Sequence, residues 1–160
     1  MNRTLAAALT AAAVMWGVVI LAAPRASRSA GTVQPAALIY AGASRICHQR
    51  PERSFQRAGV QMPVCARCSG LYLSGAAGTL LAWSRRGRRR PMRTTRTRCL
   101  VLISAVPTAA TFMLEMSGIV PFSNATRAIA AAPLGAAAGW LFVRMLRYDA
   151  PFDGDEIHNG

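Results

Sequence analysis

The feature that most constrains the fold of this chain is an apolar run of 19 residues, Leu5–Ala23, which contains no charged residue. A helix of this length, rising about 1.5 Å per residue, crosses the roughly 30 Å hydrocarbon core of a bilayer. Together with this run, three later apolar runs predict membrane spans at about residues 5–23, 64–84, 99–118 and 126–145. The sequence therefore predicts an all-α integral membrane bundle of about four transmembrane helices.

The composition supports a membrane protein over the other classes. Hydrophobic residues make up 52% and charged residues 16% of the chain, whereas soluble domains carry about 25% charge. The apolar content excludes a disordered chain. The chain has only four cysteines, too few for a disulfide-rich mini-protein. All 19 basic residues are arginine, and the net charge is +13. No aromatic interleaving or recognisable module accompanies them, so we expect the lipid bilayer and no nucleic acid as the partner.

The first run has a second interpretation as a cleaved leader. Met1-Asn2-Arg3 followed by an apolar stretch resembles a signal peptide. The run is longer than a usual signal core, and Pro24 directly follows the best cleavage site, Ala22-Ala23. We therefore expect an uncleaved helix, with a leader as the alternative.

The arginine distribution predicts the topology of a multi-pass protein in a cell membrane, the inner membrane of a bacterium. Residues 85–98 hold eight arginines and should form a cytoplasmic loop. Both termini then lie in the cytoplasm, and residues 24–63 form an outer loop. We expect a single membrane domain over residues 1–148 and an acidic disordered tail over residues 149–160.

Two predicted spans carry a small residue at every fourth position, which allows close approach of helix backbones in lipid. We expect these faces to pack against each other or against a neighbour, so that a homo-oligomer could form through them. The faces comprise Gly70, Ser74 and Gly78 in the second span, and Ala131, Gly135 and Gly139 in the fourth.

The chemistry-bearing residues lie in two short words, CHQRPERS at residues 47–54 and CARCSG at residues 65–70. If Pro63 opens the second span, Cys65 and Cys68 share the first turn of a helix, where the dipole favours thiolates. The predicted metal ligands are Cys47, His48, Cys65 and Cys68. Three cysteines and one histidine are a known structural zinc set.

The ligand set leaves alternatives open. Cys47 and His48 are adjacent and point different ways in regular structure, so three thiolates, or two thiolates and the imidazole, could bind with another ligand. The thiols could instead form a disulfide between Cys47 and either Cys65 or Cys68, or remain inert. Cys65 and Cys68 could also form a thiol–disulfide exchange pair.

Other groups fit the site less well. A c-type haem is disfavoured, because Ser69 stands where its attachment pattern requires histidine. Cys99 and His158 are predicted on the cytoplasmic side, away from the two words.

The outer ends of the last two spans bring further polar groups to the same face. A charge within a span needs a partner, so Glu115 should pair with Arg127 or face the Cys/His cluster. We expect Glu115, Arg127, Asn124 and Arg53 around the metal ligands as supporting residues. For Arg53 and Arg67, binding of an external anion is the alternative.

The two words resemble the signature of an uncharacterised bacterial and archaeal membrane-protein family, a domain of unknown function. The resemblance covers roughly residues 45–140, and a looser later match comprises Pro107, Glu115, Asn124, Arg127 and Gly135. Many relatives carry Asp about four residues after the proline, where this chain has Thr111. The resemblance implies a small multi-span protein with a Cys/His site, and it implies no activity.

The leading functional hypothesis is a small integral membrane protein with a zinc-like site at the outer end of the second span. A membrane thiol–disulfide oxidoreductase using Cys65 and Cys68 is the first alternative. A metal or small-ion transporter is the second, although Glu115 supplies the one carboxylate within the predicted spans. Whether the protein is an enzyme is left open by the residues.

Overall fold

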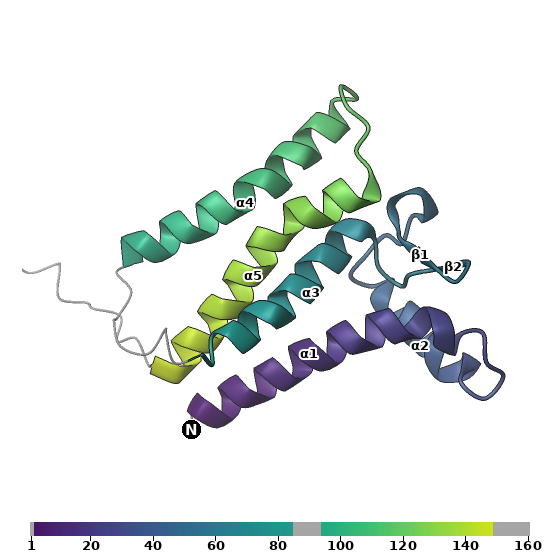
Figure 1. Cartoon of the computed structure of the whole chain (residues 1–160), viewed down its shortest axis with the longest axis horizontal. Helices are drawn as coiled ribbons and strands as arrows, with labels where there is room; N and C mark the ends of the chain where they lie inside the picture. The colour runs from purple at the N-terminus through teal and green to yellow at the C-terminus, as the bar shows by residue number, and fades with distance from the viewer. Residues whose placement is uncertain (1, 85–93, 149–160) are drawn as a thin grey trace, which may run out of the picture.

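The computed structural model describes residues 2–84 and 94–148, and these residues form five α-helices (Figure 1). The helices are α1 (Asn2–Ala26), α2 (Val33–Ala43), α3 (Ala66–Leu81), α4 (Thr94–Met116) and α5 (Asn124–Tyr148). A short 3-10 helix (Pro51–Arg53) and a hairpin of β1 (Gln56–Arg57) and β2 (Val60–Gln61) lie between α2 and α3.

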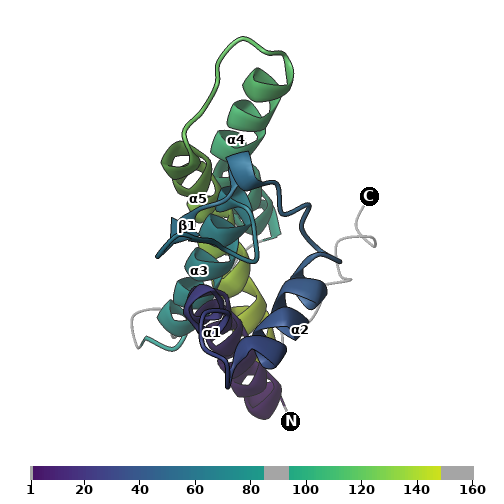
Figure 2. The ribbon, with the colours of Figure 1, turned by 90° about the vertical axis from the view of Figure 1, so that its right-hand side faces the viewer.

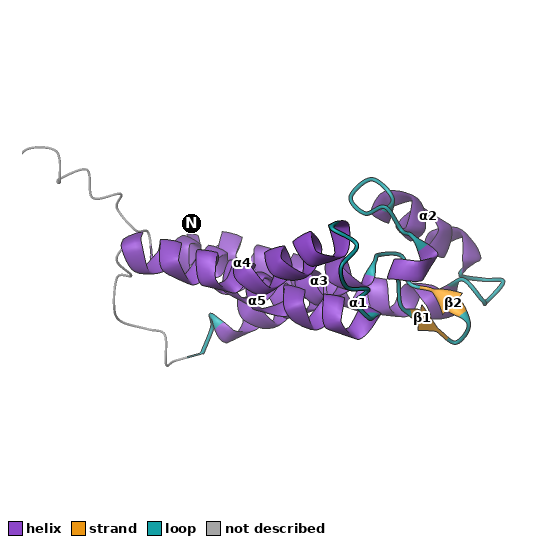
Figure 3. Ribbon diagram, turned by 90° about the horizontal axis from the view of Figure 1, so that it is seen from above, coloured by secondary structure: helices purple, strands orange, loops and turns teal. Residues whose placement is uncertain are grey.

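The four longer helices, α1, α3, α4 and α5, run between the same two ends of the molecule (Figures 1 and 3). The short helix α2 and the hairpin gather at one end, which faces the viewer in Figure 2. We call it the motif end, because residues 44–65 lie there. Helix α1 begins and α5 ends at the opposite end, and α3 returns the chain from the motif end to that end.

Three helices are long and apolar enough to cross a membrane. Their spanning segments are Arg3–Ala26, Thr95–Met116 and Asn124–Arg147, with mean hydropathies of 2.3, 1.8 and 1.5. The mostly helical architecture is thereby confirmed, with three candidate spans in the described residues where the sequence predicted about four.

The helix at the second predicted span, 64–84, is shorter than expected, since α3 has only 16 residues. Pro63 does not open it. Cys65 keeps an extended backbone, with φ −67° and ψ 163°, and serves as the N-cap of a helix that begins at Ala66. The two cysteines are therefore the N-cap and third residue of α3, still one turn apart.

Helix α4 begins earlier than predicted and takes up part of the expected loop 85–98. Its first residue is Thr94, because threonine and arginine after Pro91 present no helix breaker. The rest of that loop, residues 85–93, and the tail 149–160 with His158 lie outside the described residues.

The predicted outer loop, 24–63, contains regular secondary structure along much of its length. Helix α1 continues through Pro24 to Ala26, and α2 and the hairpin follow. The hairpin turn places Ala58 and Gly59 at φ 54° and 77°, the left-handed conformation that tight two-residue turns require.

Helices α3 and α5 pack through their small residues, and the two predicted faces meet each other. A methyl group added at Gly78 would overlap the Ala136 carbonyl, and one at Gly139 would overlap the Gly75 carbonyl. Ala131 is fully buried. These faces therefore cover each other within the chain, which is the first of the two expected packings, and a homo-oligomer stays a prediction.

Candidate metal centre

Three of the four cysteines meet at the motif end. The Sγ atoms of Cys47, Cys65 and Cys68 all lie within 4.8 Å of one another. Cys47 lies in the turn that follows α2, and its backbone N–H donates to the Ala43 carbonyl at 2.9 Å. Cys65 and Cys68 belong to the first turn of α3. Segments 18 residues apart thus converge on one point.

The thiols sit in an apolar environment built by three helices. Cys47 and Cys65 are buried in a cluster with Ile20 of α1 and Val64. Trp16 packs at its edge and meets the ring of Tyr72 edge to face, with centroids 6.1 Å apart. Burial of this kind penalises a bare thiolate, so the site favours an arrangement in which the charge is shared or neutralised.

The backbone and the neighbouring thiols stabilise a thiolate at this point. The N–H of Cys65 donates to the Sγ of Cys47 at 3.1 Å. Hydrogen bonding from the Cys68 side chain lowers the pKa of Cys65, at the N-cap, to about 5 against the opposing effect of burial. The lowered pKa favours the thiolate of Cys65, and the thiolate is the form that binds metals.

The donor set fits a thiophilic metal ion. With Zn–S distances of about 2.3 Å, sulfur atoms of a tetrahedral site are about 3.8 Å apart. The three Sγ atoms, all within 4.8 Å of one another, need to close by about 1 Å at most. Soft sulfur donors select zinc, Cu(I) or iron–sulfur chemistry over magnesium or calcium.

His48 lies outside this group of three thiols. His48 is exposed, and its Nδ1 accepts a long hydrogen bond of 3.3 Å from the backbone N–H of Arg50. His48 as a ligand stays a prediction.

Residues beside the predicted ligands hold the cysteine segments together. Gln49, at φ 47°, donates from Nε2 to the Tyr40 and Pro63 carbonyls at 2.8 and 2.7 Å. Gln61 donates to the Gln49 carbonyl at 2.5 Å, and the Tyr40 hydroxyl donates to the Gln61 carbonyl. Sequence reasoning missed this scaffold, although Gln49 is part of the CHQ word.

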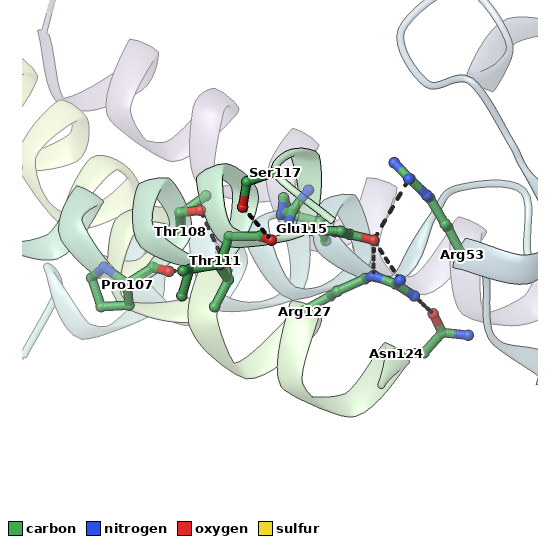
Figure 4. Close-up of polar contacts among 10 residues, drawn as sticks. Arg53, Pro107, Thr108, Thr111, Glu115, Ser117, Asn124 and Arg127 are labelled. Atoms are coloured by element: carbon green, nitrogen blue, oxygen red, sulfur yellow. Dashed lines mark hydrogen bonds and ion pairs between the residues drawn. The ribbon is translucent and has the colours of Figure 1, made fainter. Parts of the chain in front are cut away.

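The predicted supporting residues form a second cluster around Glu115 (Figure 4). Arg127 donates to Oε1 from Nη2 at 2.5 Å and from Nε at 3.1 Å. Nη2 of Arg67 lies 3.3 Å from Oε2, and Nη2 of Arg53 lies 3.6 Å from Oε1. Glu115 therefore pairs with Arg127, the simpler of the two expectations, and also with two further arginines.

Asn124 links this cluster to the PERS word. Its Oδ1 accepts from Nη1 of Arg127 at 2.7 Å, and its Nδ2 donates to the Ser54 carbonyl at 3.0 Å. Thr111, which stands where many relatives carry an acid, donates to the Pro107 carbonyl at 2.9 Å (Figure 4). It thus bonds within its own helix.

The remaining cysteine is separate. Cys99 is exposed and lies near the start of α4, at the end of the molecule opposite the motif end.

The comparisons with known proteins point to one family. A family model described as a predicted membrane protein (DUF2085) matches residues 47–141, more than half of the chain. An uncharacterized protein of Methanothermobacter thermautotrophicus is 33% identical over 91 residues, 56% of this chain and 78% of that protein. An uncharacterized protein of Methanocaldococcus jannaschii is 49% identical over 43 residues, 27% of this chain and 28% of that protein. No solved structure matches the chain.

Proposed function

We propose, from the premise that the chain belongs to the DUF2085 family of predicted membrane proteins, that it is a small membrane protein holding a zinc-like ion. The proposed ligands are Cys47, Cys65, Cys68 and His48. The observation that carries the proposal is the convergence of three Sγ atoms within 4.8 Å from two separate segments.

The ion would act as a tie between the outer segment and the helix bundle. Cys47 ends the segment that contains α2, whereas Cys65 and Cys68 start α3. A metal bound by both cross-links them, and a closed shell of four protein ligands is typical of a structural site. The exposed His48, adjacent to Cys47 in the chain, is the proposed fourth ligand of that shell.

The proposed topology has four spans, with α3 as the fourth. Helix α3 runs from the motif end, where α1 ends, to the opposite end of the molecule, where α4 begins. Its 16 residues measure about 24 Å. The eight arginines of residues 85–98 favour a cytoplasmic position for that loop and for both termini in a bacterial inner membrane. A reporter protein fused after Arg90 should be located in the cytoplasm. A reporter found outside the cell would contradict this orientation.

A thiol–disulfide oxidoreductase using Cys65 and Cys68 is the second candidate, and the lowered pKa of Cys65 favours it. Reactive exchange cysteines are partly exposed, however, and Cys65 is buried. The two candidates respond differently to His48→Ala, which should impair a metal site and leave an exchange pair largely unaffected.

A transporter has less support. A groove of about 420 Å³ between α1, α3 and α5 is lined mainly by apolar side chains such as Leu9, Leu71 and Phe142. An ion path normally needs several polar groups.

Cobalt titration tests the metal proposal directly. Addition of Co²⁺ to the reduced, detergent-purified protein should produce thiolate-to-cobalt absorption in the near ultraviolet, and Zn²⁺ should abolish it. No sulfur charge-transfer band in the wild-type protein would reject the proposal. Cys99→Ser, which alters the one cysteine outside the cluster, serves as the control and should leave the band unchanged.

A further inference from the structure

The Glu115 cluster carries more positive charge than its own carboxylate can neutralise. Three guanidinium groups face Glu115, whose side chain is 7% exposed, so the cluster has a formal charge of +2. Through residue 148 the sequence contains only one other carboxylate, Glu52, and that residue is exposed. Nothing acidic in the described chain therefore balances the excess.

The arginines also retain unused hydrogen-bond donors. Each guanidinium has five N–H groups. In the described part of the chain, the Arg53 guanidinium makes only the 3.6 Å ion pair with Glu115, too long for a hydrogen bond. Arg67 makes one hydrogen bond, and its Nε is buried without a partner. Buried donors normally have partners, so Arg67 is a donor for which the described chain supplies too few acceptors.

The position of the cluster suits an anion at a membrane surface. Glu115 lies in the last turn of α4, whereas Arg67 and Arg127 lie in the first turns of α3 and α5. Two helix N-termini thus add their partial positive charge to that of the side chains. If α4 and α5 span the bilayer, this level is that of the lipid headgroups.

The surrounding contacts fix two of the arginines, Arg67 and Arg127, in place. Arg67 lies over the ring of Phe112 at 5.4 Å, and Arg127 is held by both Glu115 and Asn124. Arg53 approaches from the end of the 3-10 helix, on the opposite side of the carboxylate from α5 (Figure 4). Such a preorganised group loses little side-chain entropy on binding a ligand.

We propose that Arg53, Arg67 and Arg127, oriented by Glu115, form a binding site for a phosphate-class anion. Guanidinium groups match phosphate oxygens with paired N–H donors, and charge-assisted bonds of this kind are among the strongest in proteins. The phosphate can belong to a lipid headgroup or be free in solution. The site is distinct from the thiol cluster, and the proposal does not depend on a bound metal.

Equilibrium dialysis of the full-length protein in an uncharged detergent tests the site. One arm uses radiolabelled inorganic phosphate, and the other uses dihexanoyl phosphatidic acid below its micelle concentration. The variant is Arg53→Gln, which removes the arginine with the fewest contacts. The matched control is Arg50→Gln, an exposed arginine three residues earlier that takes part in none of the ion pairs described for Glu115. Helical circular dichroism should be the same for all three proteins.

We expect saturable binding that weakens about tenfold or more in Arg53→Gln, the effect of losing a charge-assisted bond, and that is unchanged in Arg50→Gln. Binding in the phosphate arm assigns the site to a free phosphate, and binding only in the phosphatidic acid arm assigns it to a headgroup. Absence of binding in both arms overturns the proposal. An equal loss in Arg53→Gln and Arg50→Gln also overturns it, because the attraction would then be diffuse surface charge.

Discussion

The backbone N–H of Cys65 donates to the Sγ of Cys47 at 3.1 Å. This bond joins the two cysteine words through main chain rather than through a metal. It aims the Cys47 sulfur at the start of α3, where Cys65 and Cys68 stand one turn apart. The relationship explains how the three thiols can lie within 4.8 Å of one another before an ion binds.

The role of His48 is tested by His48→Ala. If the imidazole completes the shell, the affinity for Zn²⁺ should fall by at least about tenfold, while the sulfur-to-cobalt absorption persists because the three thiolates are untouched. Competition with a chromogenic chelator measures the affinity. An unchanged affinity would mean that solvent or another group fills the fourth position.

The stability of the Glu115 cluster is tested by Glu115→Gln. The substitution leaves three guanidinium groups close together without a counter-charge, so we expect a loss of about 3 kcal/mol, as found when one partner of a buried pair is removed. Thermal unfolding in detergent measures the loss. The control is Glu52→Gln, an exposed carboxylate, which should change stability by less than about 0.5 kcal/mol. Similar effects of the two variants would contradict the account.

The packing of α3 against α5 is tested by Gly78→Ala. The added methyl would overlap the Ala136 carbonyl, so the two backbones must separate, at a cost of about 1–3 kcal/mol. Gly42→Ala in α2 is the matched control, because nothing lies within 4 Å of the methyl added there. The melting temperature should fall for Gly78→Ala and hold or rise for Gly42→Ala. Equal melting temperatures would show that the helices do not pack at this point.

The apolar runs predict the long helices well because a bilayer-spanning segment is defined by composition and length alone. The error at α3 has a local cause: Cys65 adopts an extended N-cap conformation two residues after Pro63, and hydropathy does not detect a cap. Helix α2 escaped prediction because its 11 residues are too short to be read as a span and lie in a segment expected to be a loop.

The candidate site was predicted in part for a similar reason. Spacing predicts that Cys65 and Cys68 share one helical turn, and the CH word adds Cys47 as a predicted metal ligand. Two features depend on how the segment after α2 folds back. His48 lies apart from the thiols, and Arg53 and Arg67 both pair with Glu115 (Figure 4). Tertiary contacts of that kind leave no period or spacing in a single sequence.

The most direct test of the central claim is the metal content of the detergent-purified protein, measured by inductively coupled plasma mass spectrometry. The account predicts about one zinc-like ion per chain in the wild type and in Cys99→Ser, and loss of the ion in Cys65→Ser. Alkylation before and after reduction provides the thiol count on the same samples. A wild-type protein without metal, in which two thiols resist alkylation until reductant is added, would contradict the account and replace the metal with a disulfide.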